Sequence, residues 1–303
     1  MKFLIATFDH PYYLWQVLVQ INNFMKYGYD EDTVYIVATH QPSEILMSIM
    51  RHPKTKAKFI LYKDERKNAK YPSSLRPHLL ERFFNDHKEY EQETILYLDP
   101  DVVFTKKLDF SKYLNDDTWY LSDTRSYISS NYIKSKSEKL FNEMCEIAKV
   151  TPEEITAIDE NAGGAQYLMK GINADFWEKV YNDSEDLYMH MKKTEHIYSP
   201  DNPIQYWTAD MWAVLWNAIY FKHEVKIDKD LEFCWSTYTI DCWDRMYIFH
   251  NAGIPGDSEE HFSKITYQVS PFNKKLVEND KFCTYKYVQE IKETEETFKD
   301  ILW

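Results

Sequence analysis

The first hundred residues alternate between short apolar runs and longer amphipathic segments. Runs typical of buried β-strands lie at residues 2–7, 33–38, 59–62 and 94–98. Segments with apolar residues at helical spacing lie between them, at residues 14–27, 42–51 and 74–86. Gly28 follows the first of these segments, where a helix would end. This alternation predicts an α/β fold whose mixed, mostly parallel sheet is flanked by helices.

The second half of the chain is less regular. Helical patterns lie at residues 136–149, 152–158, 174–182 and 184–193, with a further helical segment near the end of the charged tail 278–300. A glycine pair at 163–164 reads as a turn into a strand, and the run 246–250 reads as a strand that ends in His250. Asp210 opens an apolar helix, where it fits the N-cap position.

The stretch 95-ILYLDPDVVF-104 reads as one buried strand that carries Asp99 and Asp101. If the strand is taken as 94–98, the aspartates lie at or just past its carboxyl end, and in a nucleotide-binding type of sheet ligands lie beyond the carboxyl ends of the strands. Two neighbouring carboxylates need a positive partner, and either a Lys or Arg side chain or a divalent cation would serve. Asp-Pro-Asp is also ordinary turn chemistry, so the pattern alone leaves both interpretations open.

Glycine is used sparingly, with only six in the chain. Four of them form two groups, Gly163-Gly164 and Gly253/Gly256. Such positions often require a positive φ or a close approach of backbone, although plain surface turns are the alternative.

Composition and charge restrict the class of protein. The net charge of −13 lacks the electrostatic footprint of a protein that grips phosphate backbones non-specifically. The four cysteines form no CxxC pair, which favours neither a zinc site nor a disulfide scaffold. No window has the length of a membrane span, and the apolar run at the N-terminus is too short for a signal peptide. We therefore expect a cytoplasmic protein, and the Lys, Asn and Tyr usage suggests a low-GC bacterium or its virus.

Six ordered motifs carry a resemblance to a known family. They are 6-ATFDHPYY-13, 73-SSLRPHLLERFF-84, the aspartate stretch, 161-NAGGAQYL-168, 208-TADMWAVLWN-217 and 248-IFHNAGIPG-256. Together they resemble the GT-A fold nucleotide-sugar glycosyltransferases, above all the glycogenin and lipopolysaccharide galactosyltransferase family. A more distant likeness is to the plant enzymes that glycosylate hydroxyproline and serine. The likeness is one of ordered motifs and runs from about residue 3 to residue 256.

The resemblance implies a single GT-A domain over residues 1–256. Its nucleotide-sugar-binding half would be 1–104 and its acceptor half 105–256, with a C-terminal extension, 257–303, packed on the same domain. It further implies that Asp99, Asp101 and His250 bind Mn²⁺ or Mg²⁺.

The donor implied is a UDP-sugar or another nucleoside diphosphate sugar. Contacts implied for the nucleobase and ribose are Ala6, Thr7, Asp9 and Tyr12; those for the rest of the donor are Arg76, Arg82, Gly163, Gly164, Gly253 and Lys264. Lys264 stands in for the lysine of a Lys-Pro-Trp motif that this chain lacks.

The reaction implied is transfer of a hexosyl or pentosyl group with retention of configuration. Asp210 and Gln166 are the implied catalytic residues, although the family's Asp-Gln-Asp is reduced here to Ala-Asp. The acceptor could be a glycan, a protein side chain or a modified nucleobase, the last disfavoured by the net charge.

Two alternatives come from other classes: a nucleotidyltransferase-like nucleotide-diphosphate enzyme and a catalytically silent carbohydrate-binding protein. An enzyme of the first class is expected to have a Gly-rich loop with Lys or Arg after the first strand, and the segment FDHPYY has neither. The presence of all three metal-ligand candidates argues against the second.

Overall fold

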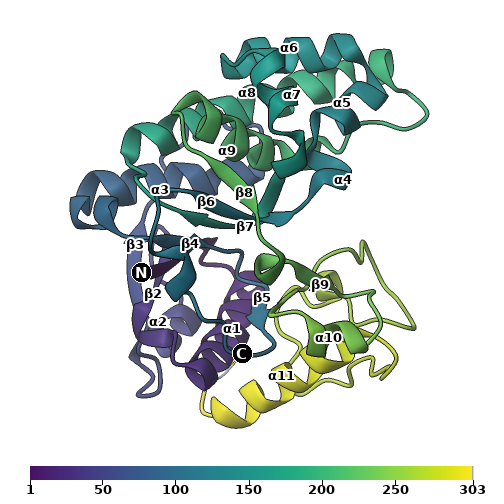
Figure 1. The fold of residues 1–303 in the computed structure, drawn as a ribbon. Helices are drawn as coiled ribbons and strands as arrows, with labels where there is room; N and C mark the ends of the chain where they lie inside the picture. The colour runs from purple at the N-terminus through teal and green to yellow at the C-terminus, as the bar shows by residue number, and fades with distance from the viewer. Residues whose placement is uncertain (302) are drawn as a thin grey trace. The chain divides into compact units, whose positions relative to one another are not determined.

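A computed structural model describes residues 1–301 and 303 (Figure 1). These residues group into two compact units, each built from segments that are separate in sequence. The terminal unit comprises residues 2–63, 98–109 and 230–303, and the central unit comprises Met1 with residues 64–97 and 110–229. The predicted functional boundaries after residues 104 and 256 remain predictions.

The terminal unit contains parallel strands joined by helices. Its helices and strands are β1 (Lys2–Phe8), α1 (Pro11–Tyr27), β2 (Thr33–Ala38), α2 (Glu44–Arg51), β3 (Lys58–Tyr62), β5 (Val102–Phe104), β9 (Phe233–Trp235), α10 (Asp241–Arg245), β10 (Ile248–His250) and α11 (Cys283–Thr297). Strands β3, β2 and β1 lie side by side in that order, and both pairs are parallel. The predicted alternation of strands and helices is confirmed.

Helix α1 begins earlier than its apolar pattern suggests. Pro11 occupies the first turn, where its fixed φ is favourable and its missing N–H costs nothing. The His10 side chain caps this end by accepting a hydrogen bond from the Tyr12 backbone, at 3.2 Å. Gly28 ends the helix with a φ of 75°, as predicted. The helix packs against α11, α2 and β5.

The strand predicted at 94–98 is confirmed as β4 (Ile95–Tyr97), but the interpretation of the whole stretch 95–104 as one strand was wrong, because Val102–Phe104 form a separate strand, β5. β4 belongs to the central unit, whereas β5 belongs to a separate small sheet of the terminal unit, in the order β5-β10-β9. Pro100 has no backbone N–H to pair, so the chain turns at this point. Asp99 and Asp101 therefore lie in a turn between two strands.

The central unit combines a four-stranded arrangement with a group of helices. Its helices and strands are α3 (Leu75–Asp86), β4, β6 (Trp119–Asp123), α4 (Arg125–Ile128), α5 (Ser130–Lys136), α6 (Glu138–Ala148), α7 (Pro152–Ala157), β7 (Gly163–Met169), α8 (Ala174–Tyr198), α9 (Ala209–Tyr220) and β8 (Val225–Ile227). β7 is antiparallel to β4 and β6, and β8 is parallel to β6. The α/β class with a mixed sheet is confirmed.

Helix α8 is a single helix, although the sequence predicted two, at 174–182 and 184–193. The predicted break fell at Asp183, a buried residue. Its carboxylate accepts hydrogen bonds from Lys179, at 2.6 Å, and from the Asn217 side chain, at 2.8 Å. These partners let a polar residue stay buried inside a continuous helix, which packs against α3, α6 and α9.

The glycine pair opens β7, so the predicted strand is confirmed, whereas the predicted turn at the glycines themselves is wrong. Neither glycine has a positive φ; Ala165 has one, at 67°, beside a register shift between β6 and β7. A Cβ at Gly163 would lie 2.6 Å from the Leu121 Cβ and 2.6 Å from the Ser122 carbonyl oxygen. The close approach of backbone, which was the other expectation for these glycines, is therefore the reason for Gly163.

Asp210 is not the N-cap of α9, contrary to the sequence prediction. The helix begins at Ala209, so Thr208 holds the N-cap position and Asp210 lies in the first turn.

Among the described residues, no helix combines the length and apolar character needed to cross a membrane.

Candidate metal centre

The Asp99-Pro100-Asp101 turn is fixed from helix α1. The Gln20 side-chain amide donates to the carbonyl oxygens of Asp99, at 2.9 Å, and Val102, at 2.8 Å. Its own oxygen accepts a hydrogen bond from the Tyr35 hydroxyl at 3.0 Å. One buried amide thus satisfies two backbone carbonyls of the turn and is itself held in place.

A second buried amide on the same helix fixes β5. Asn23 donates to the Phe104 carbonyl oxygen at 2.9 Å and accepts from the Phe104 N–H at 2.8 Å. Sequence reasoning missed Gln20 and Asn23. The available signal was polar residues three and four apart, Gln16, Gln20 and Asn23, within an otherwise apolar helix.

His250 reaches the turn through the small sheet. It ends β10, pairing with Val102 of β5 on one side and with Trp235 of β9 on the other. The following residue, Asn251, donates its backbone N–H to the Asp101 carbonyl oxygen at 3.0 Å. Residues about 150 positions apart in sequence are therefore brought together by backbone pairing.

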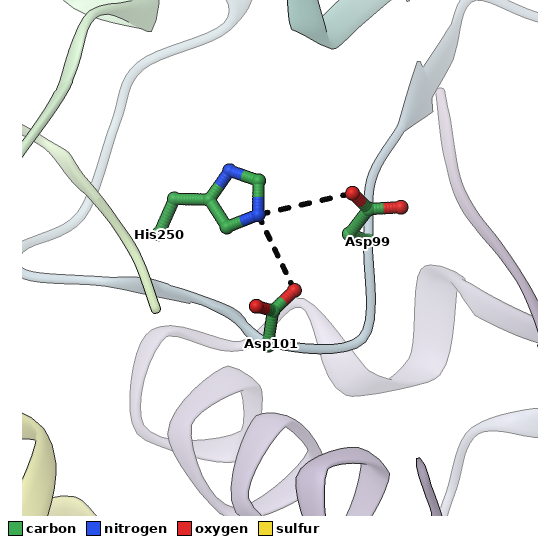
Figure 2. A group of neighbouring side chains, drawn as sticks. All are labelled: Asp99, Asp101 and His250. Atoms are coloured by element: carbon green, nitrogen blue, oxygen red, sulfur yellow. Dashed lines mark ion pairs between the residues drawn. The ribbon is translucent and has the colours of Figure 1, made fainter. Parts of the chain in front are cut away.

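Asp99, Asp101 and His250 converge, as the sequence predicted (Figure 2). The His250 Nε2 atom lies 3.3 Å from Asp101 Oδ1 and 3.8 Å from Asp99 Oδ2. The three ligand atoms all lie within 4.8 Å of one another, and no other such group of three occurs among residues 1–301 and 303.

The donor set fits a divalent cation. Carboxylate oxygens suit Mg²⁺ and Mn²⁺, and an imidazole nitrogen is compatible with Mn²⁺. Adjacent ligands of an octahedral ion bound at about 2.1 Å lie roughly 3 Å apart, so the side chains need only small movements to enclose such an ion.

A lysine balances part of the negative charge here. The Lys264 ammonium group forms an ion pair with Asp101 Oδ2, and the Asp101 side chain is only 5% exposed. Burial alone would raise the pKa of the Asp101 carboxyl, but Lys264 and His250 more than offset this and hold it well below its ordinary value. Burial alone would lower the pKa of Lys264, but the Asp101 carboxylate raises it overall. Both groups therefore remain charged at neutral pH.

The predicted nucleobase and ribose contacts lie at the carboxyl end of β1 and the start of α1. Ala6 and Thr7 are buried in the strand. Asp9 accepts hydrogen bonds from the Ser43 backbone at 2.8 Å and the Thr39 hydroxyl at 2.9 Å, which fixes the loop before α2. Burial, despite the nearby Lys264, raises the pKa of Tyr12 above its ordinary value. Tyr12 thus lies close enough to Lys264 and Asp101 to feel both of their charges.

Gly253 needs to be glycine. Its φ is +90°, and an added Cβ would lie 3.1 Å from the Trp235 ring. Only glycine adopts this backbone conformation without strain, so the chain can turn sharply three residues after His250.

Asp210 and Arg76 form an ion pair in the central unit. The Tyr71 hydroxyl lies 2.5 Å from Asp210 Oδ1, while Arg76 contacts Oδ2. Burial, together with the Asp210 carboxylate, raises the pKa of Tyr71 well above its ordinary value, so the hydroxyl stays protonated. Both carboxylate oxygens of Asp210 thus have partners from the segment 71–76.

The other predicted site residues of the central unit lie in helix α3 (Arg82) and in strand β7 (Gly163, Gly164 and Gln166). Arg82 forms an ion pair with Glu65 at 3.1 Å. Gln166 is fully buried in β7 and accepts a hydrogen bond from the Ser122 hydroxyl at 2.6 Å. Gly163 and Gly164 lie in the same strand. The functional roles of these residues remain predictions.

No protein-family model and no curated protein matches this chain. Among solved structures, the apo structure of WbbM, described as a bifunctional glycosyltransferase, matches with a TM-score of 0.52 at 9% identity over 99% of this chain and 51% of the other. The chain thus spans about half the length of that protein. Two structures of the galactosyltransferase LgtC, one with donor and acceptor sugar analogs and one an active-site mutant, match over the full length of both chains with a TM-score of 0.47 at 13% identity.

Identities this low show a shared fold and leave the chemistry to the residues themselves. The likeness to WbbM confirms the fold that the sequence motifs implied: this chain shares the α/β fold of that protein.

Proposed function

We propose that this protein is a metal-dependent glycosyltransferase that uses a nucleoside diphosphate sugar, UDP-linked in the first instance, as its donor. The observation that carries the proposal is the convergence of Asp99, Asp101 and His250 at a turn beyond the carboxyl end of β4. Ligands of this fold class bind at such strand ends.

The side chains divide the work at this centre. Asp99, Asp101 and His250 would hold Mn²⁺ or Mg²⁺, which when bound supplies charge neutralisation for a departing diphosphate. Gln20 keeps the two aspartates in register by holding the carbonyl oxygens of Asp99 and Val102. The Gly253 turn brings the backbone after His250 back sharply, which suits the close approach of an anionic ligand.

The remaining assignments rest on the family resemblance. It gives the nucleobase and ribose to Ala6, Thr7, Asp9 and Tyr12, and the rest of the donor to Arg76, Arg82, Gly163, Gly164, Gly253 and Lys264. It gives Asp210 and Gln166 roles at the donor sugar and implies retention of configuration. The acceptor is a glycan, a protein side chain or a modified nucleobase.

The fold shared with a protein described as a glycosyltransferase supports the proposal over a nucleotidyltransferase. The segment after β1 supports it too, because residues 9–13 contain neither glycine nor a cationic Lys or Arg. A nucleotidyltransferase is expected to carry such a loop, because its backbone N–H groups and cations would hold the triphosphate.

The test is hydrolysis of nucleotide sugars in the absence of an acceptor. A panel of UDP-, GDP-, CDP- and dTDP-sugars is incubated with the protein and Mn²⁺, with EDTA in parallel. We expect release of one nucleoside diphosphate, dependent on the ion, and an α-configured sugar released from an α-linked donor when followed early by NMR. In a parallel incubation with a nucleoside triphosphate and a sugar 1-phosphate, release of pyrophosphate with formation of the nucleotide sugar would instead support the nucleotidyltransferase. Binding of sugar without turnover of any donor would support the silent carbohydrate-binding protein.

A further inference from the structure

The candidate metal centre contains a cation of the chain's own. The Lys264 ammonium group is paired with Oδ2 of Asp101, the carboxylate whose Oδ1 faces His250. Both oxygens of this ligand are therefore engaged before any ion arrives. The inference that follows rests on the proposed function, because it assumes that the centre takes a divalent ion.

Lys264 is delivered by an anchored segment. It begins a short 3-10 turn, Lys264–Thr266, two residues after the buried Phe262. The Phe262 ring stacks on Tyr267 with ring centroids 5.1 Å apart, and the Tyr267 carbonyl oxygen accepts a hydrogen bond from the Trp15 indole at 3.1 Å. Because both ends of the segment are tied to buried groups, the lysine is held close to Asp101 and does not sample the solvent freely.

The charges at the centre explain why a lysine is needed there. Asp99 and Asp101 bring two carboxylates to one turn, and Lys264 offsets one of the two negative charges. Tyr12 faces the same pair but is neutral, since its pKa is raised. Without Lys264 the nearly buried Asp101 would lose the ammonium group paired with its Oδ2 while a second carboxylate lies in the same turn, which is costly.

A divalent ion would bind the carboxylate that Lys264 already contacts. Oδ1 of Asp101 faces His250, so an ion held there would lie close to the ammonium group on Oδ2 of the same carboxylate, and two cations at such short range repel each other. Binding of the ion is therefore opposed by the ammonium group and becomes more favourable when Lys264 moves away from Asp101. By thermodynamic linkage, a group that stabilises the metal-free centre lowers the affinity for the metal.

We propose that Lys264 is an internal counter-ion that occupies the metal-binding carboxylate of Asp101 in the metal-free protein, and that divalent ions bind by displacing it. Lys264 would therefore lower the affinity of the centre for a divalent ion. Its removal strengthens binding of the ion while weakening the metal-free protein.

The test measures Mn²⁺ binding alone, without nucleotide and without activity, from the EPR signal of free Mn²⁺. Lys264→Met removes the charge but keeps a side chain of similar length. We expect it to bind Mn²⁺ about tenfold more tightly than the wild type, the factor that corresponds to about 1.4 kcal/mol. Lys275→Met is the matched control, because it removes an exposed lysine of the same unit and changes the net charge equally. This control should bind Mn²⁺ like the wild type.

Thermal unfolding supplies the second readout. Lys264→Met should unfold at a lower temperature than the wild type in EDTA, and the difference should shrink or reverse when Mn²⁺ is saturating. If this variant does not fold, Lys264→Gln serves instead, since its amide can still donate a hydrogen bond to Asp101 without carrying charge.

Equal or weaker Mn²⁺ binding by the uncharged variants, with the wild type binding well, would overturn the role of Lys264 and leave the proposed function standing. If neither the wild type nor any variant binds Mn²⁺ or Mg²⁺, both the counter-ion and the metal-dependent function are wrong.

Discussion

Two buried aspartates, Asp101 and Asp210, are each paired with a cationic side chain, but only one of them also has other possible metal ligands beside it. Asp210 has one oxygen on Arg76 and the other on the Tyr71 hydroxyl, so its partners are a cation and a hydrogen-bond donor. Asp101 has Lys264 on one oxygen, and its other neighbours, Asp99 and His250, can themselves donate electron pairs to a metal. Burial of a carboxylate is therefore not enough to mark a metal centre. What distinguishes Asp101 is that other possible metal ligands, the Asp99 carboxylate and the His250 imidazole, lie beside it.

The largest expected effect follows from a substitution of Asp101 in the candidate metal centre. Asp101→Asn removes a ligand charge, and we expect the metal-dependent turnover of the donor sugar to fall by roughly 100-fold or more. The measurement is the initial rate of nucleoside diphosphate release at saturating Mn²⁺. Asp280→Asn, at an exposed position of the same unit, is the control and should keep the wild-type rate. A rate for Asp101→Asn within a few-fold of the wild type would remove Asp101 from the reaction.

The second effect breaks the Asp210 pair. Asp210→Asn leaves Arg76 without its carboxylate in a mostly buried setting, and we expect a loss of about 3 kcal/mol in the free energy of unfolding. Urea unfolding measures this loss, which should be the same with EDTA and with Mn²⁺. The gain in stability on adding Mn²⁺ should also equal that of the wild type. A loss of the Mn²⁺ effect in this variant would make Asp210 part of the metal centre and end the contrast between the two aspartates.

A third effect sharpens the account of how the aspartate turn is held. Gln20→Ala leaves the buried carbonyl oxygens of Asp99 and Val102 without their shared donor, which should cost about 2 kcal/mol of stability. Because the ligands would lose their support, Mn²⁺ affinity should fall by roughly tenfold. Isothermal titration with Mn²⁺ checks this second expectation. Gln268→Ala, at a surface amide that donates to the Ile265 carbonyl, should change neither quantity.

The smallest effect is expected from alanine substitutions at two glycines, Gly163 and Gly256, whose surroundings differ. Gly163→Ala would place a methyl group 2.6 Å from the Leu121 Cβ and from the Ser122 carbonyl oxygen, so the strands must move apart, at a cost of roughly 1–3 kcal/mol. Nothing lies within 4 Å of a Cβ at Gly256, so Gly256→Ala should stay within about 0.5 kcal/mol of the wild type. Equal unfolding midpoints for the two variants would contradict the close approach at Gly163.

The sequence predicted best the parts that depend on local periodicity. The strands at 33–38 and 59–62 and the helices that alternate with them follow directly from runs of apolar residues. The sequence also predicted that Asp99, Asp101 and His250 come together, because an aspartate pair beside an apolar run and a late histidine at a strand end are both local patterns.

The errors occurred where polar residues are buried with partners distant in sequence. Asp183 looked like a break between helices until Lys179 and Asn217 were seen to satisfy it. Asp210 looked like a helix cap, since nothing local revealed Arg76 and Tyr71 as its partners. The single strand predicted over 95–104 failed for a related reason: the pairing of β5 with β10 is set by residues near 250. Such tertiary partners leave no periodic signal in one sequence.

The most direct test of the metal-dependent glycosyltransferase is thermal unfolding with Mn²⁺ and UDP, added separately and together, on the wild type and on Asp101→Asn. A ligand present at about a hundred times its dissociation constant stabilises a protein by roughly 2.7 kcal/mol, which is an easily measured shift. The account predicts a larger shift with both ligands than the sum of the two alone, and loss of this excess in the variant. If neither UDP nor any other nucleoside diphosphate shifts the midpoint with Mn²⁺ present, the aspartates of residues 99 and 101 are a structural turn and the proposed function is wrong.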